Sequence, residues 1–329
     1  LSREPLTQGI SLGTDPVERQ RVQGRGELPH AILVQLLPGL YPFQSHFFDR
    51  GAGLRMHYRD EGQGPPVLMV HGNPSWSIYY RNLLQALAPT HRCLAPDHIG
   101  MGLSDKPDDA AYAYTLTQRI DDLEAFVASL ELREPLTLVV HDWGGMIGFG
   151  WAVRHPEQIA RLVILNTAAF PLPAGKRLPW QLKLTRTPLG TFLVRGLNAF
   201  SWGAARFGCS RTKMPAHVSR AYRAPYNSWK NRIATLRFVQ DIPLGPEDPA
   251  FAVVQEVAAN LPRFRETPTL IGWGAKDFVF DEPFLRQWRE YLPQAKVHRI
   301  PDAGHYVLED AAEEIIPVIV AFVRSSQPG

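Results

Sequence analysis

Short apolar runs alternate with longer amphipathic segments along the chain from Tyr41 onward. Runs rich in Val, Leu and Ile predict buried strands, and segments whose apolar positions recur every three or four residues predict helices. The predicted strands cover residues 45–50, 54–58, 67–70, 92–95, 136–140, 162–165, 268–273 and 296–300. The predicted helices cover residues 79–87, 116–130, 146–154 and 311–323. This alternation predicts an α/β fold, with a mostly parallel eight-stranded sheet and helices on both faces.

The alternation stops at Pro171 and resumes near residue 263. We therefore expect an α/β core formed by residues 41–170 and 263–329. The intervening residues, 171–262, are rich in aromatic residues, Pro and Arg and predict a helical cap. Open α/β sheets place their active sites at the carboxyl ends of the strands, so the cap should lie over that edge.

Residues 1–40 precede the alternating pattern. Their first part mixes Arg, Glu, Gln, Gly and Pro, which predicts a poorly ordered leader. A short apolar helix over residues 30–37 would then act as a strap on the core or as an amphipathic anchor. No apolar run approaches the roughly 20 residues that a transmembrane helix needs, and no small-residue cleavage pattern of a signal peptide is present.

The charges are unevenly distributed, although the formal net charge is only +3. Residues 171–240 contain thirteen Lys and Arg and no Asp or Glu, which leaves 22 basic against 32 acidic residues elsewhere. A basic cap favours contact with an anionic membrane surface, an acidic partner or a carboxylate-bearing ligand, unless it is an ordinary solvated helical face. The two cysteines, Cys93 and Cys209, support no disulfide framework, and we expect a cytoplasmic protein.

Residues 136–145 form a buried strand that turns sharply, through glycines, into a helix. Such an elbow presents a nucleophile at the top of the sheet, usually at the centre of a G-x-S-x-G motif. Asp142 occupies that position here, with Val140 in place of the first glycine and Gly144 after it. An aspartate that faces the N–H groups of a helix N-terminus should stay ionised at neutral pH. We therefore predict that Asp142 is a nucleophile rather than a simple helix cap.

A carboxylate nucleophile attacks an electrophilic sp3 carbon and forms an alkyl ester with the enzyme, which water then cleaves. The cleavage needs a general base, and His305, in the loop between the last strand and the last helix, is the candidate. Asp277 follows the strand at 268–273 and is predicted to orient the imidazole. The chain order of nucleophile, acid and histidine is the order found in α/β-hydrolases.

Asn73 and Trp143 are the predicted anion-binding residues. Their backbone N–H groups would form an oxyanion hole, and their amide and indole N–H groups would bind a leaving anion. Trp76 and Phe170 are predicted to line the substrate pocket. Further aromatic candidates, which would otherwise form the core of the cap, are Tyr79, Trp180, Phe200 and Trp229.

No cofactor is expected. The segment Gly100-Met101-Gly102 lacks the remaining glycine and the strand-turn-helix setting of a nucleotide-binding loop. The remaining histidines at strand ends have no partner at metal-ligand spacing and are expected to bond backbone groups; they are His71, His98 and His141. A small hydrophobic electrophile fits the predicted pocket chemistry better than nucleic acid does.

Four motifs resemble the haloalkane dehalogenase group of α/β-hydrolases: HGNPSWS at 71–77, PDHIGMGLSDKP at 96–107, VVHDWGG at 139–145 and DAGH at 302–305. The resemblance covers about residues 41–323. The acid at Asp277, the Asn166-Thr167 pair after the sixth strand, and the donors Asn73 and Trp143 resemble the third subfamily of that group. The cap segment 222–244 is similar to that of bacterial β-lactone decarboxylases of long-chain olefin biosynthesis.

The resemblance implies an enzyme that opens a cis-3,4-dialkyl β-lactone and releases CO2 and a cis-alkene. Haloalkane dehalogenase is the alternative, because the same triad suits both reactions. Epoxide hydrolase is a second alternative, with Tyr222 and Tyr226 as candidates for polarising the ring, and a non-catalytic binding protein would require a broken triad. The resemblance also implies partner enzymes of the same pathway, for which the basic cap is a candidate contact surface.

Overall fold

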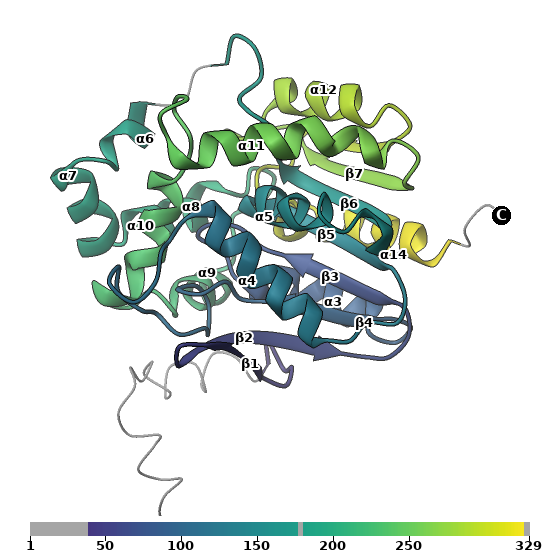
Figure 1. The fold of residues 1–329 in the computed structure, drawn as a ribbon, viewed down its shortest axis with the longest axis horizontal. Helices are drawn as coiled ribbons and strands as arrows, with labels where there is room; N and C mark the ends of the chain where they lie inside the picture. Colours follow the sequence, from purple (N-terminus) through teal and green to yellow (C-terminus); the bar gives the residue numbers. More distant parts are fainter. Residues whose placement is uncertain (1–38, 177–179, 326–329) are drawn as a thin grey trace, which may run out of the picture.

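The computed structural model describes residues 39–176 and 180–325 (Figure 1). Within these residues, eight strands form one sheet in the order β1-β2-β4-β3-β5-β6-β7-β8. The strands are β1 (His46–Gly51), β2 (Leu54–Glu61), β3 (Pro66–Val70), β4 (Arg92–Pro96), β5 (Leu136–Asp142), β6 (Ile159–Thr167), β7 (Thr269–Gly274) and β8 (Lys296–Ile300). β2 pairs antiparallel with both β1 and β4, and the other pairs are parallel. The predicted fold class is confirmed.

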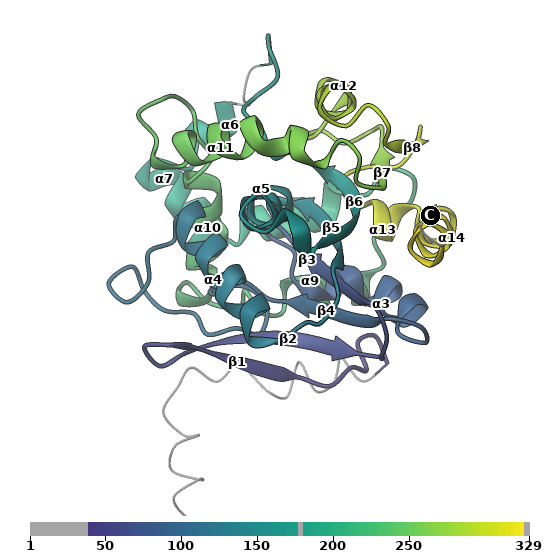
Figure 2. The same cartoon turned by 45° about the vertical axis from the view of Figure 1, so that its right-hand side comes forward.

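Helices cover both faces of the sheet (Figures 1 and 2). One face carries α4 (Leu116–Ser129), α5 (Trp143–Ala152), α11 (Pro249–Asn260) and α12 (Glu282–Tyr291), and the other carries α3 (Arg81–Leu87) and α14 (Ala312–Arg324). All residues of β3 and β5 are buried as a result, which explains their uninterrupted apolar sequences. Shorter helical segments are η1 (Ser77–Tyr80), η2 (Pro156–Gln158), η5 (Leu261–Phe264) and α13 (Val307–Asp310).

Local sequence sets where these helices begin and which side they bury. The side chain of Thr115 caps α4 by accepting a hydrogen bond from the Gln118 N–H at 3.3 Å. In α4 the buried positions recur at helical spacing and include Ile120, Leu123 and Phe126. By contrast, α5 is buried nearly all round, because it lies between β5 and the helices α4 and α11.

The segment predicted as a cap is helical in its described part and lies beyond the carboxyl ends of β5 and β6 (Figure 1). It contains α6 (Trp180–Leu184), α7 (Pro188–Thr191), η3 (Phe192–Gly196), α8 (Ala199–Phe207), α9 (Ala216–Arg223), η4 (Lys230–Arg232) and α10 (Ile233–Gln240). The predicted interval, 171–262, also takes in α11, which packs against α4 and α5 of the core. The division of the chain into core and cap at these limits stays a prediction.

The predicted leader, residues 1–40, lies almost wholly outside the described residues, which begin at Gly39. Among the described residues, no helix combines the length and the apolar character needed to cross a bilayer.

Candidate active site

The turn between β5 and α5 holds Asp142 in a conformation that non-glycine residues seldom adopt, with φ 51° and ψ −128°. This backbone aims the carboxylate away from the sheet. Two glycines permit the geometry, since a Cβ on Gly144 would overlap the Val70 carbonyl and a Cβ on Gly72 would overlap the Asp142 carboxylate. The predicted elbow is therefore present, and the missing glycine at Val140 does not prevent it.

Backbone N–H groups surround the Asp142 carboxylate. The Asn73 N–H donates to Asp142 Oδ1 at 2.6 Å, and the Trp143 N–H also donates to this carboxylate. Burial raises the pKa of Asp142, while the nearby His305 and the two N–H donors lower it, and the net pKa is above the ordinary value. If Asp142 carries an ester, the same two donors stabilise negative charge on its carbonyl oxygen.

His305 lies between the two carboxylates that the sequence singled out. Its Nδ1 donates to Asp277 Oδ2 at 2.8 Å, and its Nε2 lies 3.6 Å from Asp142 Oδ2. Burial lowers the pKa of His305, but the charge of Asp277, its hydrogen bond and the charge of Asp142 outweigh this effect and the net pKa is raised. The structure thus brings Asp142, His305 and Asp277 together as predicted from chain order.

The loop that carries Asp277 is fixed to the neighbouring strand. Asn166, fully buried at the end of β6, accepts a hydrogen bond from the Gly274 N–H at 2.8 Å and donates to the Gly274 carbonyl at 3.0 Å. This pair of bonds links the ends of β6 and β7 just before the loop turns to Asp277. Asn166, which the resemblance singled out, therefore has a structural function.

The loop that carries His305 is fixed to the cap through Asp310. The buried carboxylate of Asp310 accepts backbone N–H bonds from Gly304 at 2.7 Å and from Ser210, Arg211 and Thr212 at 2.6 to 3.0 Å. Nothing in the sequence around Asp310 distinguishes it from an ordinary helix acid. Its role depends on a contact between distant segments, which sequence spacing does not reveal.

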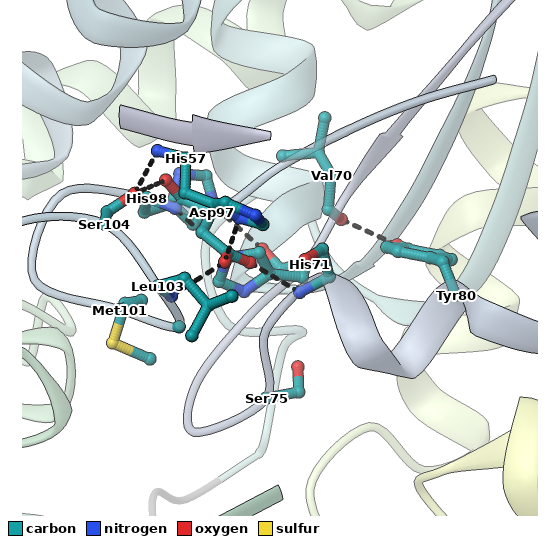
Figure 3. Close-up of polar contacts among 12 residues, drawn as sticks. His57, Val70, His71, Ser75, Tyr80, Asp97, His98, Met101, Leu103 and Ser104 are labelled. Atoms are coloured by element: carbon teal, nitrogen blue, oxygen red, sulfur yellow. Dashed lines mark hydrogen bonds and ion pairs between the residues drawn. The ribbon is translucent and has the colours of Figure 1, made fainter. Parts of the chain in front are cut away.

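A second buried network supports the loop of Asn73 (Figure 3). Asp97 accepts hydrogen bonds from His57 Nδ1 at 2.8 Å, from the Ser77 N–H at 2.7 Å and from the Leu103 N–H at 2.9 Å. Burial raises the pKa of Asp97, but His57 and the other donors reverse this and hold the pKa well below its usual range. An ionised Asp97 thus ties three segments together beneath the site.

The remaining strand-end histidines bond backbone groups, as predicted. His98 Nε2 donates to the His71 carbonyl at 2.9 Å, and the His98 N–H donates to His71 Nε2 at 3.2 Å (Figure 3). His141 Nε2 donates to the His305 carbonyl at 2.9 Å. In the described ranges, no cluster of three or more His, Cys, Asp or Glu side chains has the arrangement of a metal site.

A cavity of about 750 Å³ opens above Asp142. Its polar lining includes Asp142, His305, Asn73 and Trp143, and most other lining side chains are apolar. Of the six aromatic candidates, Phe170 and Phe200 line the cavity, whereas Trp76, Tyr79, Trp180 and Trp229 do not. Trp76 is instead fully buried and packs edge-on against Tyr41, so its predicted place in the pocket is not observed.

Sequence reasoning missed several apolar lining residues, chiefly Met146, Val239, Ile242, Phe278, Val279 and Phe280. Phe280 stacks on the His305 ring, with centroids 5.9 Å apart and planes 18° apart. The run Phe278-Val279-Phe280 directly follows Asp277, and an apolar run after a catalytic-loop acid was an available signal for this wall of the cavity.

The side chains of Asn73 and Trp143, predicted to bind a leaving anion, differ in whether the protein already engages their N–H groups. Asn73 Nδ2 donates to the Thr235 carbonyl of the cap at 3.1 Å, and Asn73 Oδ1 is buried without a hydrogen-bond partner among the described residues. Among the described residues, no acceptor bonds the indole N–H of Trp143, and Trp143 lines the cavity. The indole is therefore available to a ligand, and one amide hydrogen of Asn73 already bonds the protein.

The two tyrosines considered for epoxide chemistry lie outside the cavity lining. Tyr222 donates to Glu309 Oε1 at 2.6 Å, and Tyr226 donates to the Ser75 carbonyl at 3.3 Å. Both hydroxyl groups are engaged by the protein, so neither is placed to polarise an epoxide oxygen.

A parallel sheet with an acid at the strand-turn-helix elbow, a histidine after the last strand and a covering cap define an α/β-hydrolase with a carboxylate at the nucleophile position. The chain belongs to the alpha/beta hydrolase fold family, whose sequence model matches residues 65–312.

More specific relatives are enzymes. The chain is 59% identical over 293 residues to the cis-3-alkyl-4-alkyloxetan-2-one decarboxylase of Shewanella oneidensis, covering 89% of this chain and 92% of the relative. It is 52% identical to the enzyme of the same name from Xanthomonas campestris pv. campestris, covering 87% and 98%. The crystal structure of haloalkane dehalogenase DbeA from Bradyrhizobium elkani superposes with a TM-score of 0.77 at 28% identity, covering 85% and 97%. The chain is therefore an enzyme of the dehalogenase-like group, with higher identity to the decarboxylases.

Proposed function

We propose that this enzyme decarboxylates cis-3,4-dialkyl β-lactones to cis-alkenes and CO2, with Asp142 as nucleophile. The observation that carries the proposal is the approach of three groups at one end of an apolar cavity: Asp142, the Asn73 N–H at 2.6 Å and His305 Nε2 at 3.6 Å. The high identity to two cis-3-alkyl-4-alkyloxetan-2-one decarboxylases supports the choice of substrate.

In the first step, Asp142 attacks C4 of the lactone, which is the sp3 ring carbon bonded to the ring oxygen. The bond between C4 and the ring oxygen breaks, and C4 forms an ester with Asp142. The former lactone carbonyl becomes a carboxylate that remains attached to C3. Attack from the rear places the new ester bond opposite the carboxylate across the carbon–carbon bond. The indole N–H of Trp143 is available to bond the released carboxylate.

In the second step, the bond between the substrate carbon and its carboxylate breaks. Its electron pair forms the alkene, CO2 leaves, and Asp142 is regenerated as a carboxylate. The first step inverts the attacked carbon, and the second removes the Asp142 ester and the carboxylate from opposite sides of the carbon–carbon bond. The two alkyl chains of a cis-lactone therefore end on the same side, and a cis-alkene results. The sequence consumes no water and no proton, and the charge of His305 offsets the negative charge on Asp142 before and after the reaction.

The cavity suits an uncharged substrate with alkyl chains. Its apolar lining comes from both the core and the cap, and its volume of about 750 Å³ lies in the range of ligand pockets. Polar groups gather at the end that holds Asp142, so the reactive ring is oriented there while the chains contact the apolar walls.

Haloalkane dehalogenation is the second candidate function. It is favoured by the indole N–H of Trp143, which no other residue of the described ranges engages, and by the structural similarity to a dehalogenase. In that reaction His305 must act as a base on water, so the two functions differ in the use made of the same triad.

We retain three further expectations as proposals. Cytoplasmic location is supported by the two free cysteines, Cys93 and Cys209. Contact with partner enzymes of the same pathway or with an anionic surface is supported by the basic composition of residues 171–240. A small hydrophobic substrate rather than nucleic acid is supported by the apolar cavity.

The test is to incubate the purified enzyme separately with a cis-dialkyl β-lactone and with 1-bromobutane or 1,2-dibromoethane, and to quantify alkene and bromide. Asp142→Ala serves as the inactive control. The proposal predicts alkene from the lactone and no enzymatic release of bromide. Bromide release without alkene formation would assign the dehalogenase function instead.

A further inference from the structure

The outer side of the cap exposes an unusual number of large apolar side chains. Twelve such side chains are prominent in the described ranges, and only Phe47 and Val297 lie away from the cap and the cavity mouth. Seven of them lie between residues 180 and 229: Trp180, Leu189, Phe192, Leu197, Trp202, Phe207 and Trp229. Concentrations of this kind mark surfaces that contact another molecule or a membrane.

Four of these side chains form what we call the apolar cap face: Leu197, Trp202, Phe207 and Trp229. They are 47% to 61% exposed. The rings of Trp202 and Phe207 pack edge to face, with centroids 6.1 Å apart. The segments that carry Leu197 and Trp229 are joined by Arg195, whose Nε donates to the Trp229 carbonyl at 3.1 Å and whose guanidinium lies 4.7 Å from its ring.

Cations accompany the apolar cap face. Five cations of the cap are exposed and form no ion pair within the described ranges: Lys183, Arg206, Lys213, Arg220 and Lys230. Arg206 lies 5.2 Å from the Phe207 ring. Other cap cations are used inside the molecule: Lys176, Arg186, Arg211 and Arg237 pair with acids outside the segment, and Arg232 bonds three backbone carbonyls. Of the unpaired exposed cations, Arg206 therefore lies beside a ring of the apolar cap face, and Lys230 directly follows Trp229 in the chain.

The apolar cap face is continuous with the mouth of the cavity. On α8, the positions Phe200, Gly203, Ala204 and Phe207 line the cavity, whereas Trp202 and Arg206 face solvent. Phe207 belongs to both surfaces, because it lines the cavity and is 57% exposed. Across the opening, exposed side chains of Phe278 and Val279 also line the cavity.

We infer that the apolar cap face docks on the surface of an anionic lipid bilayer, with the cavity mouth towards the lipid. Exposed tryptophans beside lysines and arginines suit the boundary between headgroups and acyl chains, where rings insert and cationic ends contact phosphates. The charge is complementary, because residues 171–240 contain no acid.

Docking by this face would let an alkyl-chain substrate pass from the bilayer to the cavity without crossing water. That benefit rests on the proposed function, whereas the docking itself does not. Vesicle binding is therefore measured without substrate, so that its failure and the failure of the proposed reaction remain distinguishable.

The test is flotation of the full chain with vesicles of phosphatidylcholine alone or with 30% phosphatidylglycerol. We expect binding to the anionic vesicles that weakens as salt is raised. Arg206→Gln combined with Lys230→Gln should lower the partition coefficient by about fivefold or more for each charge removed. Trp202→Gln combined with Trp229→Gln should lower it about tenfold on both vesicle types.

The matched control is Phe47→Gln combined with Arg133→Gln, which removes an exposed ring and an exposed cation away from the cap. It should bind as the unaltered protein does, and circular dichroism and unfolding temperature should be equal in all variants. Absence of flotation, or flotation that the cap variants leave unchanged, would overturn the inference. So would a self-associated species that only the cap variants dissociate, because a second copy would then occupy this face.

Discussion

His305 Nε2 lies 3.6 Å from Asp142 Oδ2, beyond hydrogen-bond distance but within range of strong charge attraction. The charge of His305 lowers the pKa of Asp142 against the larger effect of burial, and the charge of Asp142 helps to raise the pKa of His305. Each charge therefore favours the ionised form of the other group, the carboxylate of Asp142 and the imidazolium of His305.

This coupling makes a prediction for the pH dependence of the β-lactone reaction. Activity requires ionised Asp142, so kcat/KM should fall as the pH drops through the raised pKa of this carboxyl. His305→Gln removes the charge that lowers the pKa of Asp142, so the acidic limb should move to higher pH. The measurement is kcat/KM against pH for both proteins. An unchanged acidic limb in His305→Gln would contradict the coupling.

The ionised side chain of Asp142 should also destabilise the folded protein. Its pKa is raised above 3.8, so the folded state disfavours the charged form at pH values above the folded pKa, and the penalty vanishes below the unfolded pKa. Asp142→Asn should therefore raise the free energy of unfolding at pH 7 by roughly 0.5–2 kcal/mol, the usual size of one stabilising substitution. The gain should disappear below about pH 4. Urea unfolding at both pH values checks this, and a less stable Asp142→Asn protein at pH 7 would refute it.

Gly72 should be required for the position of the nucleophile. A Cβ at this residue would overlap the side chain of Asp142 and the Trp143 nitrogen. We expect Gly72→Ala to lower kcat about 100-fold or more, since a displacement of about 1 Å at a reacting group has effects of that order. Gly39→Ala is the control, because its Cβ would meet no atom within 4 Å. Equal activity of the two variants would show that the Asp142 loop adjusts freely.

Gly203 should limit the length of the substrate chain that the cavity accepts. It lines the cavity, and an added Cβ meets no atom within 4 Å, so a larger side chain has room to enter the open space. Gly203→Leu should lower kcat/KM for long-chain β-lactones about tenfold and for short-chain ones less than about threefold. Kinetics with a series of chain lengths tests this. A uniform loss at all lengths would indicate a distorted site instead of a shortened cavity.

The site residues that directly follow strands could be predicted from the sequence. Asp142, Asp277 and His305 each follow a predicted strand, and parallel strands bring their carboxyl ends to one edge. Trp76 was predicted to line the pocket, but the structure buries it fully in the core, directly before the η1 turn.

Contacts between distant segments were beyond sequence reasoning. The thirteen Lys and Arg of residues 171–240 suggested a basic surface, yet Arg232 bonds backbone carbonyls and Arg237 pairs with Asp109 at 2.6 Å. Substitution of Arg232 or Arg237 would therefore disturb the cap itself and would not test partner binding alone. The unpaired exposed cations of the cap, which include Arg206 and Lys230, could be distinguished only once these internal pairs were known.

The proposed reaction is tested most directly by turnover of a cis-dialkyl β-lactone in water enriched in oxygen-18. Alkene and β-hydroxy acid are quantified, and the peptide that contains Asp142 is analysed by mass spectrometry. Decarboxylation from the ester predicts one alkene for each lactone consumed, no β-hydroxy acid and no heavy oxygen in Asp142. Accumulation of β-hydroxy acid together with oxygen-18 in Asp142 would show that water cleaves the ester, and would contradict the proposed decarboxylation.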